Sequence, residues 1–116
     1  MKAFTLSAIV LFAACATSPN GDAKIEATLR TALDDPTSTS RSLPFEIEWG
    51  ADGTVIIPIF VRTSDTAATA AAIMRAGGST STTTRNILNA RLPMQEIRQL
   101  ARRSEVIAIE PSFKSR

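Results

Sequence analysis

Residues 55–113 read VIIPIFVRTSDTAATAAAIMRAGGSTSTTTRNILNARLPMQEIRQLARRSEVIAIEPSF. Apolar and polar residues in this stretch follow the periods of a strand, a helix, two strands, a helix and a strand. With short connections and right-handed crossovers, this order predicts an α+β fold of the ferredoxin-like type, a βαββαβ sandwich. We expect one antiparallel four-stranded sheet, with its strands in the order fourth, first, third, second and both helices on one face.

The first half of this stretch predicts a strand and then a helix. The apolar run Val55–Val61 has the composition of a strand. Residues 63–65, Thr-Ser-Asp, can cap a helix that we predict over Asp65–Ala76. Apolar residues recur along one face of that helix, at Ala67, Ala70, Ala71 and Met74. Gly77-Gly78 then predicts a left-handed helix end.

The second half predicts a strand pair, a second helix and a last strand. The pair is Ser79–Thr84 and Leu88–Leu92, around a turn at Arg85-Asn86 in which Asn86 tolerates a positive φ. Pro93 suits the first position of a helix, which we predict over Pro93–Ser104. The strand Val106–Ile109 completes the unit.

Pro58 conflicts with a central place for the first strand, because proline cannot donate a ladder hydrogen bond. We therefore expect a bulge at Pro58. The residues before it, Thr54–Ile57, would pair with Phe45–Trp49 across a turn at residues 50–53. The residues after it, Ile59–Arg62, would enter the main sheet.

The first strand is apolar on both of its faces, which predicts cover on both. The predicted helices cover one face only. The other cover could be an N-terminal helix, predicted over Ala23–Leu33, a second copy of the chain, or another protein. An uncovered apolar patch would mark an interaction surface.

The N-terminus has the pattern of a secretory signal. Met1-Lys2 precedes an apolar run, Ala3–Ala14, that is shorter than the roughly 20 residues needed to span a bilayer. Leu11–Cys15 resembles a bacterial lipoprotein box, in which Cys15 receives lipid. The alternative is an A-x-A site at residues 14–16, with cleavage before Thr17.

We thus expect an exported lipoprotein, anchored to a membrane of the bacterial cell envelope, or a secreted or periplasmic protein. The domain plan is a signal peptide at 1–14, an N-terminal helix and linker at 15–44, a packed domain at 45–113 and a tail at 114–116.

The composition argues against an enzyme. The chain of 116 residues has no His and no Tyr, and its one Cys is Cys15. The common general bases, nucleophile pairs and metal ligands are therefore missing, and no intramolecular disulfide can form. We expect no catalytic residues, no metal and no cofactor. The net charge is only +2. The arginines of the second helix, at 98, 102 and 103, occupy the face opposite Ile97 and Ala101, so they are interpreted as a solvated face rather than a nucleic-acid surface.

The span Val55–Phe113 resembles the propeptide domain of subtilisin-type serine proteases. The matching motifs, in order, are Ile59-Phe60-Val61-Arg62, Gly77-Gly78, Leu92-Pro93, Leu100-Ala101 and Val106-Ile107-Ala108-Ile109-Glu110. The segment Lys24–Leu29 is similar to the one that precedes such domains. Each motif is short, and their order and spacing over about half the chain carry the resemblance.

The resemblance implies how the domain would bind a protease. In that family the open face of a ferredoxin-like sheet packs on two surface helices of the enzyme, and an acid after the last strand caps a helix. Glu110 matches that acid, and Ser112 stands where a second acid is often found. The tail, residues Phe113, Lys114, Ser115 and Arg116, would then enter the substrate cleft as a product-like strand. Phe113 or Arg116 would face the specificity pockets.

The first functional hypothesis is therefore a protein that binds a subtilisin-like serine protease in trans and inhibits it or assists its folding, because no catalytic domain follows in this sequence. Two alternatives stay open. One is an envelope lipoprotein with a ferredoxin-like module that binds a ligand, through polar groups such as those of residues 63–65, or dimerises through the open face. The other is the remnant of a protease precursor.

Overall fold

The computed structural model describes residues 21–35 and 43–113. The predicted signal peptide at 1–14, the lipidation site Cys15 and the tail residues Lys114, Ser115 and Arg116 lie outside the described residues. The elements are η1 (Asp22–Lys24), α2 (Ala27–Asp34), β1 (Glu48–Trp49), β2 (Val55–Thr63), α3 (Thr66–Arg75), β3 (Ser79–Thr84), β4 (Ile87–Pro93), η3 (Met94–Glu96), α4 (Ile97–Ala101) and β5 (Val106–Pro111).

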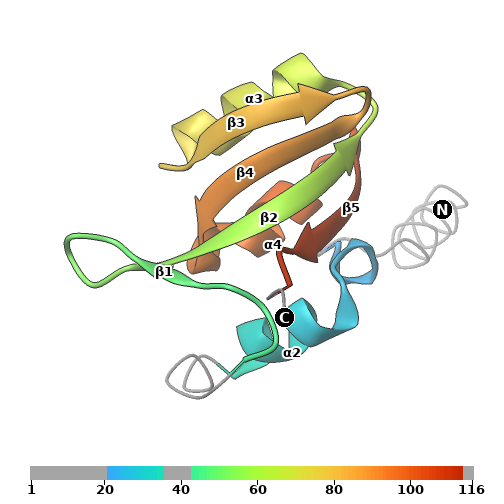
Figure 1. Ribbon diagram of the computed structural model, residues 1–116. Helices are drawn as coiled ribbons and strands as arrows, with labels where there is room; N and C mark the ends of the chain where they lie inside the picture. The colour runs from blue at the N-terminus through green and yellow to red at the C-terminus, as the bar shows by residue number, and fades with distance from the viewer. Residues whose placement is uncertain (1–20, 36–42, 114–116) are drawn as a thin grey trace, which may run out of the picture.

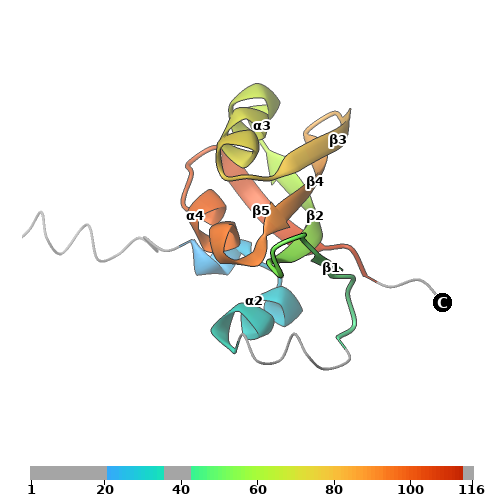
Figure 2. The ribbon, with the colours of Figure 1, turned by 90° about the vertical axis from the view of Figure 1, so that its left-hand side faces the viewer.

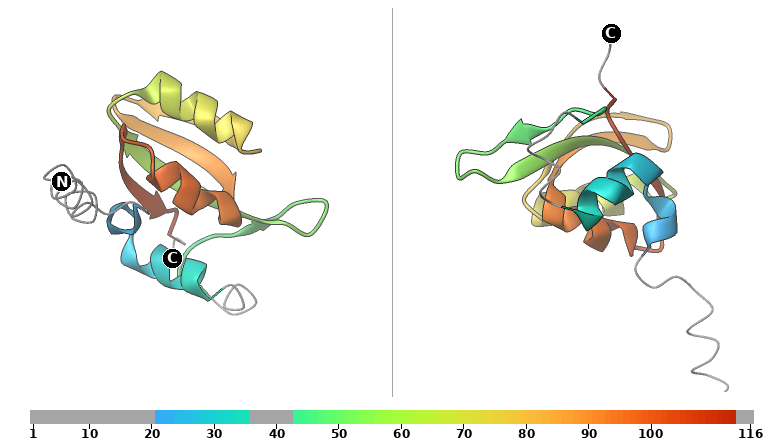
Figure 3. Two further views of the ribbon diagram at one scale, coloured as in Figure 1. Left: turned by 180° about the vertical axis from the view of Figure 1, so that it is seen from behind. Right: turned by 90° about the horizontal axis from the view of Figure 1, so that it is seen from below.

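The protein has an α+β fold around a curved antiparallel sheet of five strands (Figure 1). The long strand β2 is central: it pairs with β4 along one edge and with both β5 and β1 along the other. β3 pairs with the far edge of β4, so the sheet runs β5, β2, β4, β3. The helices α3 and α4 lie together on one face of this sheet, which leaves the other face open (Figures 2 and 3).

Pro58 causes no bulge, contrary to the sequence prediction. β2 keeps its register with β4 from Ile56 to Arg62, and Pro58 stands opposite Arg91. On the other edge, β1 pairs with Val55 and Ile56, whereas β5 begins its pairing at Ile59. Proline is tolerated here because it lies between the residues of β2 that pair with β1 and those that pair with β5.

The two ends of the first helix follow their sequence signals, but the predicted apolar face is wrong: Ala67, Ala71 and Met74 are exposed, and the buried residues of α3 are Thr69 and Ile73. The Asp65 carboxylate accepts a hydrogen bond from the Ala68 N–H at 3.0 Å and so caps α3. Gly77 has φ +89°, and the Gly78 N–H donates to the Ile73 carbonyl at 2.9 Å, which closes the helix. A Cβ at Gly78 would lie 2.3 Å from the Arg91 carbonyl oxygen, so strand β4 requires glycine there.

Three other predictions need correction. The helix predicted over Pro93–Ser104 is a 3-10 turn followed by the five-residue helix α4. The helix predicted over Ala23–Leu33 is divided at Ile25, which adopts extended backbone and forms a parallel bridge with Ile109 of β5. In the β3–β4 turn, Arg85 and not Asn86 has the positive φ, at 54°.

All layers contribute to one hydrophobic core. It includes residues from the N-terminal segment as well as from the sheet and both covering helices: Ile25, Leu29, Ala32, Phe45, Ile57, Ile59, Val61, Ile73, Leu88, Ala90, Leu92, Met94, Ile97, Leu100, Ala101, Val106 and Ile109. Arg98 of α4 joins the N-terminal segment to the body, because its guanidinium pairs with Asp22 and Asp34. Helix α2 therefore extends the helical layer and does not cover the open face (Figure 2).

Candidate functional site: the open face of the sheet

β2 divides the sheet into two chemically different faces. Ile57, Ile59 and Val61 point into the core and are at most 2% exposed. The residues between them belong to the other face, where Phe60 is 40% exposed and Arg62 is exposed. We call this second surface the open face. It comprises Ile56, Pro58, Phe60 and Arg62 of β2, Ile87, Asn89, Arg91 and Pro93 of β4, and Ala108 and Glu110 of β5, which share one side because they stand opposite one another in register.

Phe60 lies at the centre of the open face. Its cross-strand partners are Asn89 of β4 and Glu110 of β5. Two shallow hollows flank it, one of about 200 Å³ toward Glu46, Ser81 and Arg91, and one of about 40 Å³ toward Arg62 and Glu110. An exposed aromatic ring between a carboxylate and an amide suits a protein partner better than a small molecule, because neither hollow is closed enough to surround a ligand.

One ion pair fixes the border of the open face. The Arg91 Nε lies 3.0 Å from both carboxylate oxygens of Glu48, which stands opposite Ile56 on β1. Both side chains are about half exposed, at 54% and 42%, so the pair contributes little to stability. It links β1 to β4 at the rim of the larger hollow beside Phe60.

Glu110 belongs to β5 and not to a segment after it, since the last strand extends beyond the predicted Val106–Ile109 to Pro111. Its carboxylate is exposed on the open face, directly across from Phe60. Glu110 was identified from the sequence as a candidate binding residue, and Phe60 was not. In the structure the two residues lie on one surface.

Ser112 is held by the protein itself. Its N–H donates to the Pro58 carbonyl at 3.0 Å, and its own carbonyl accepts from the Glu46 N–H at 2.9 Å. Phe113 forms an antiparallel bridge with Phe45, and its side chain is 49% exposed. The tail that the sequence predicts from Phe113 onward therefore begins as part of the fold, on the side of the sheet away from α3 and α4 (Figure 2).

The polar residues 63–65, candidates for a ligand site, serve the fold instead. Thr63 is fully buried; its hydroxyl lies 2.7 Å from the Thr69 hydroxyl and 3.0 Å from the Glu105 carbonyl oxygen. Asp65 caps α3. Because these groups already have partners, this strand–helix junction offers no convergent set of polar groups to a ligand.

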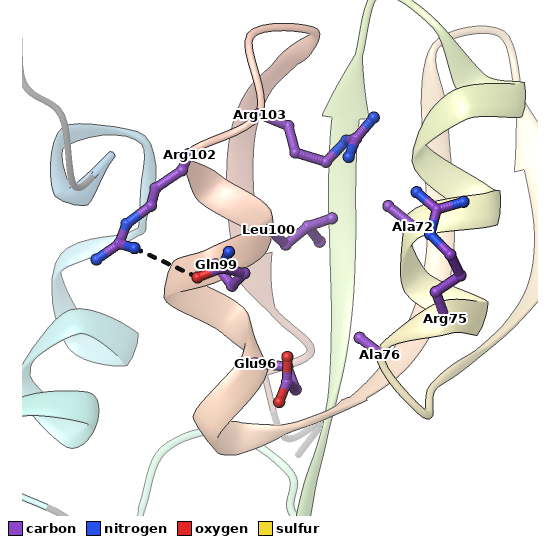
Figure 4. A pocket seen from close by; sticks show the side chains of 8 residues that line it. All are labelled: Ala72, Arg75, Ala76, Glu96, Gln99, Leu100, Arg102 and Arg103. Carbon is purple, nitrogen blue, oxygen red and sulfur yellow. Dashed lines mark hydrogen bonds between the residues drawn. The ribbon is translucent and has the colours of Figure 1, made fainter.

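A groove of about 340 Å³ lies between α3 and α4, on the far side from the open face (Figure 4). Its floor is formed by Ala72, Ala76 and Leu100, and Glu96 lies at one end. Arg75 and Arg103 point toward each other across the opposite end, whereas Arg102 turns away and bonds Gln99. Since Arg103 is already paired with Glu105, and Glu96 offsets part of the charge of Arg75 and Arg102, the groove carries no strong preference for one class of ligand.

Ionisable groups with shifted pKa values serve structural contacts. The Arg103 guanidinium lowers the pKa of Glu105 below its usual range, and the hydrogen bond to Asp34 raises the pKa of Arg98. Burial would raise the pKa of Glu26, but backbone N–H donors at the start of α2 outweigh it and lower that pKa. Two of the three arginines interpreted as a solvated face, Arg98 and Arg103, are thus engaged in ion pairs.

Within residues 21–35 and 43–113, no group of three or more carboxylates or other metal-binding side chains could hold a metal ion. No helix among the described residues has the length and apolarity to cross a membrane. Comparison with protein-family models, curated proteins and solved structures gives no match.

The residues that surround Glu110 on the open face, chiefly Phe60, Asn89 and Arg91, were not predicted from the sequence as site residues. The alternation of Asn89 and Arg91 with apolar neighbours in β4 was a signal for the face they occupy. Their assembly with Phe60 depends on strand register, which the pattern of β2 does not specify because it is apolar on both faces.

Proposed function

We propose that the protein binds a subtilisin-like serine protease through the open face and inhibits it or assists its folding. The observation that carries this proposal is the pairing of an exposed Phe60 with Glu110 on a sheet face that no described helix covers. An aromatic residue such as Phe60 is typical of the core of a protein interface, and a charged residue such as Glu110 is typical of its rim. The resemblance of residues 55–113 to subtilase propeptides supplies the class of partner.

The ferredoxin-like assignment belongs to the same proposal. It is supported by the antiparallel pairings β5–β2, β2–β4 and β4–β3 and by the placement of α3 and α4 on one face. β1 and the N-terminal segment would then be additions at the β5 edge of a βαββαβ unit.

In the proposed complex, helices of the protease pack on the open face. The Glu110 carboxylate satisfies N–H groups at the start of a partner helix and complements its dipole. Residues after Phe113 extend toward the substrate cleft and pair with its edge through main-chain hydrogen bonds. The protein makes and breaks no covalent bond in this role.

The test is inhibition of several subtilisin-like proteases by the full chain, with trypsin as a control of unrelated fold. We expect inhibition at micromolar concentration or below. Phe60→Asp should abolish inhibition. The substitution removes the apolar contact of the ring and adds repulsion between two neighbouring carboxylates. Met74→Asp is the matched control, since Met74 is 58% exposed on α3, away from the open face.

Two outcomes would count against this function. One is the absence of inhibition of every subtilase by the wild-type chain. The other is equal inhibition by Phe60→Asp, which would place the contact elsewhere. Concentration-dependent dimerisation that Phe60→Asp abolishes, without any inhibition, would favour the alternative of a dimeric envelope protein.

We further propose that the protein is exported and lipidated at Cys15. This proposal rests on the sequence of residues 1–16 alone. Cys15→Ser should release the protein from the membrane fraction of the producing cell. A wild-type N-terminus at Thr17 without lipid, found by intact-mass analysis, would indicate ordinary secretion instead.

A further inference from the structure

The chain around Ser112 departs from regular strand pairing. By register, Ser112 stands opposite Pro58, one step beyond the pair of Pro111 and Ile59. The Ser112 N–H donates to the Pro58 carbonyl, as in the hydrogen-bonded type of antiparallel residue pair. Any other residue at 58 would return a hydrogen bond from its own N–H to the Ser112 carbonyl. Proline has no N–H, so that carbonyl is left without its ladder donor.

A different segment supplies the missing donor. The Glu46 N–H reaches the Ser112 carbonyl at 2.9 Å, and Phe45 forms a bridge with Phe113. We call residues 43–47 the arm. Its alternate residues Leu43, Phe45 and Ile47 pack against the core, and Phe45 is fully buried. The arm is therefore a fixed extended segment whose outward-facing N–H is presented to the C-terminal segment.

We propose that the arm is a positioning strand: by binding the carbonyl that Pro58 leaves free, the Glu46 N–H sets the direction in which the chain leaves the sheet after Ser112. This inference rests on the proposed function and deepens it. An extended segment that enters a protease cleft binds more tightly when its direction is fixed beforehand, because less conformational entropy is lost on binding.

The test compares two substitutions at one position in the full chain. Glu46→Pro removes the backbone N–H, whereas Glu46→Ala keeps the N–H and removes only the carboxylate. We expect Glu46→Pro to raise the inhibition constant roughly fivefold to tenfold over Glu46→Ala, the scale of one net hydrogen bond. Circular dichroism and the melting temperature confirm that both variants fold.

A second variant restores the competing donor. Pro58→Ala returns an N–H to residue 58, which should draw the Ser112 carbonyl back toward β2 and weaken its bond to the arm. Amide hydrogen exchange measured by NMR should then become faster at Glu46, by roughly fivefold or more, than in the wild-type chain. This readout does not require a protease.

The outcomes separate the inference from the function on which it rests. If the wild-type chain inhibits no subtilase, the proposed function fails, and the exchange rate at Glu46 decides the positioning role alone. If the wild-type chain inhibits and Glu46→Pro is as potent as Glu46→Ala, the positioning strand is refuted. Unprotected exchange at Glu46 in the wild-type chain, or an unchanged rate in Pro58→Ala, refutes it as well.

Discussion

The two faces of β2 both carry apolar residues but differ in burial. Ile57 and Ile59 are packed under α3 and α4 and are almost completely buried, whereas Phe60, between Ile59 and Val61 in sequence, is 40% exposed. Burial of an aliphatic side chain stabilises the fold by about 1.5–3 kcal/mol. The ring of Phe60 gains only part of this in the free protein, and its exposed apolar area remains available to a partner. The proposed function therefore uses the face that contributes less to stability.

The largest effect is expected on the face of the sheet that α3 and α4 cover, which we call the closed face. Ile57→Ala should lower the free energy of unfolding by about 2–5 kcal/mol, because it leaves a cavity among fully buried neighbours. Phe60→Ala should cost less than about 1 kcal/mol despite removing more atoms, because that ring is partly in water already. Urea unfolding of both variants measures the difference. Equal losses would mean that the open face is covered in solution.

The second prediction concerns the buried pair of hydroxyl groups formed by Thr63 of β2 and Thr69 of α3. Thr69→Val should lower the free energy of unfolding by about 1–2 kcal/mol, because it removes a hydrogen bond between two fully buried side chains. Thr69→Ser keeps the hydroxyl and serves as the matched control, as does Thr84→Val on the exposed edge strand. If Thr69→Val unfolds at the same urea concentration as Thr69→Ser, the hydroxyl pair does not stabilise the closed face.

Acid should weaken the ion pair between Arg103 and Glu105 that follows α4. The folded-state pKa of Glu105 is held below its usual range by Arg103, so the contribution of this pair is present at neutral pH and is lost as the pH falls through the folded pKa. The melting temperature should therefore decline from about pH 5 to pH 3. Glu105→Gln should start lower and decline less over that range. A parallel decline in both proteins would assign the acid sensitivity to other carboxylates.

The smallest effect is expected for the ion pair at the border of the open face. Arg91→Met should change the free energy of unfolding by less than about 0.5 kcal/mol, because both partners are largely in water. The same substitution should weaken protease binding measurably, since it releases β1 from the edge of the proposed interface. A stability loss as large as that of Ile57→Ala would contradict the contrast between the two faces.

The order of elements from β2 to β5 could be predicted because each has a local cause. Asp65 caps α3 and Gly77-Gly78 ends it, through contacts within a few residues of chain. The pairing order of the strands agrees with the one expected from that order of elements. The length of the second helix could not be predicted in the same way, because residues 102–105 have helical propensity but turn toward β5.

The candidate site was predictable only in part. Glu110 was identified by its place in a motif, but its neighbours Phe60 and Asn89 come from strands that are distant in sequence. The arm could not be predicted as a partner of Ser112, because its hydrogen bond is donated by a backbone N–H, which every residue except proline has.

The sequence by itself determined an α+β chain with capped and terminated elements, since helix caps, glycine stops and apolar periods act over a few residues. Only the tertiary structure decided which side of β2 stays open, why Pro58 is tolerated and where the N-terminal segment packs. Those outcomes depend on register and on backbone hydrogen bonds between distant segments. A strand that is apolar on both sides does not encode them, and a missing N–H has consequences only once its opposite strand is known.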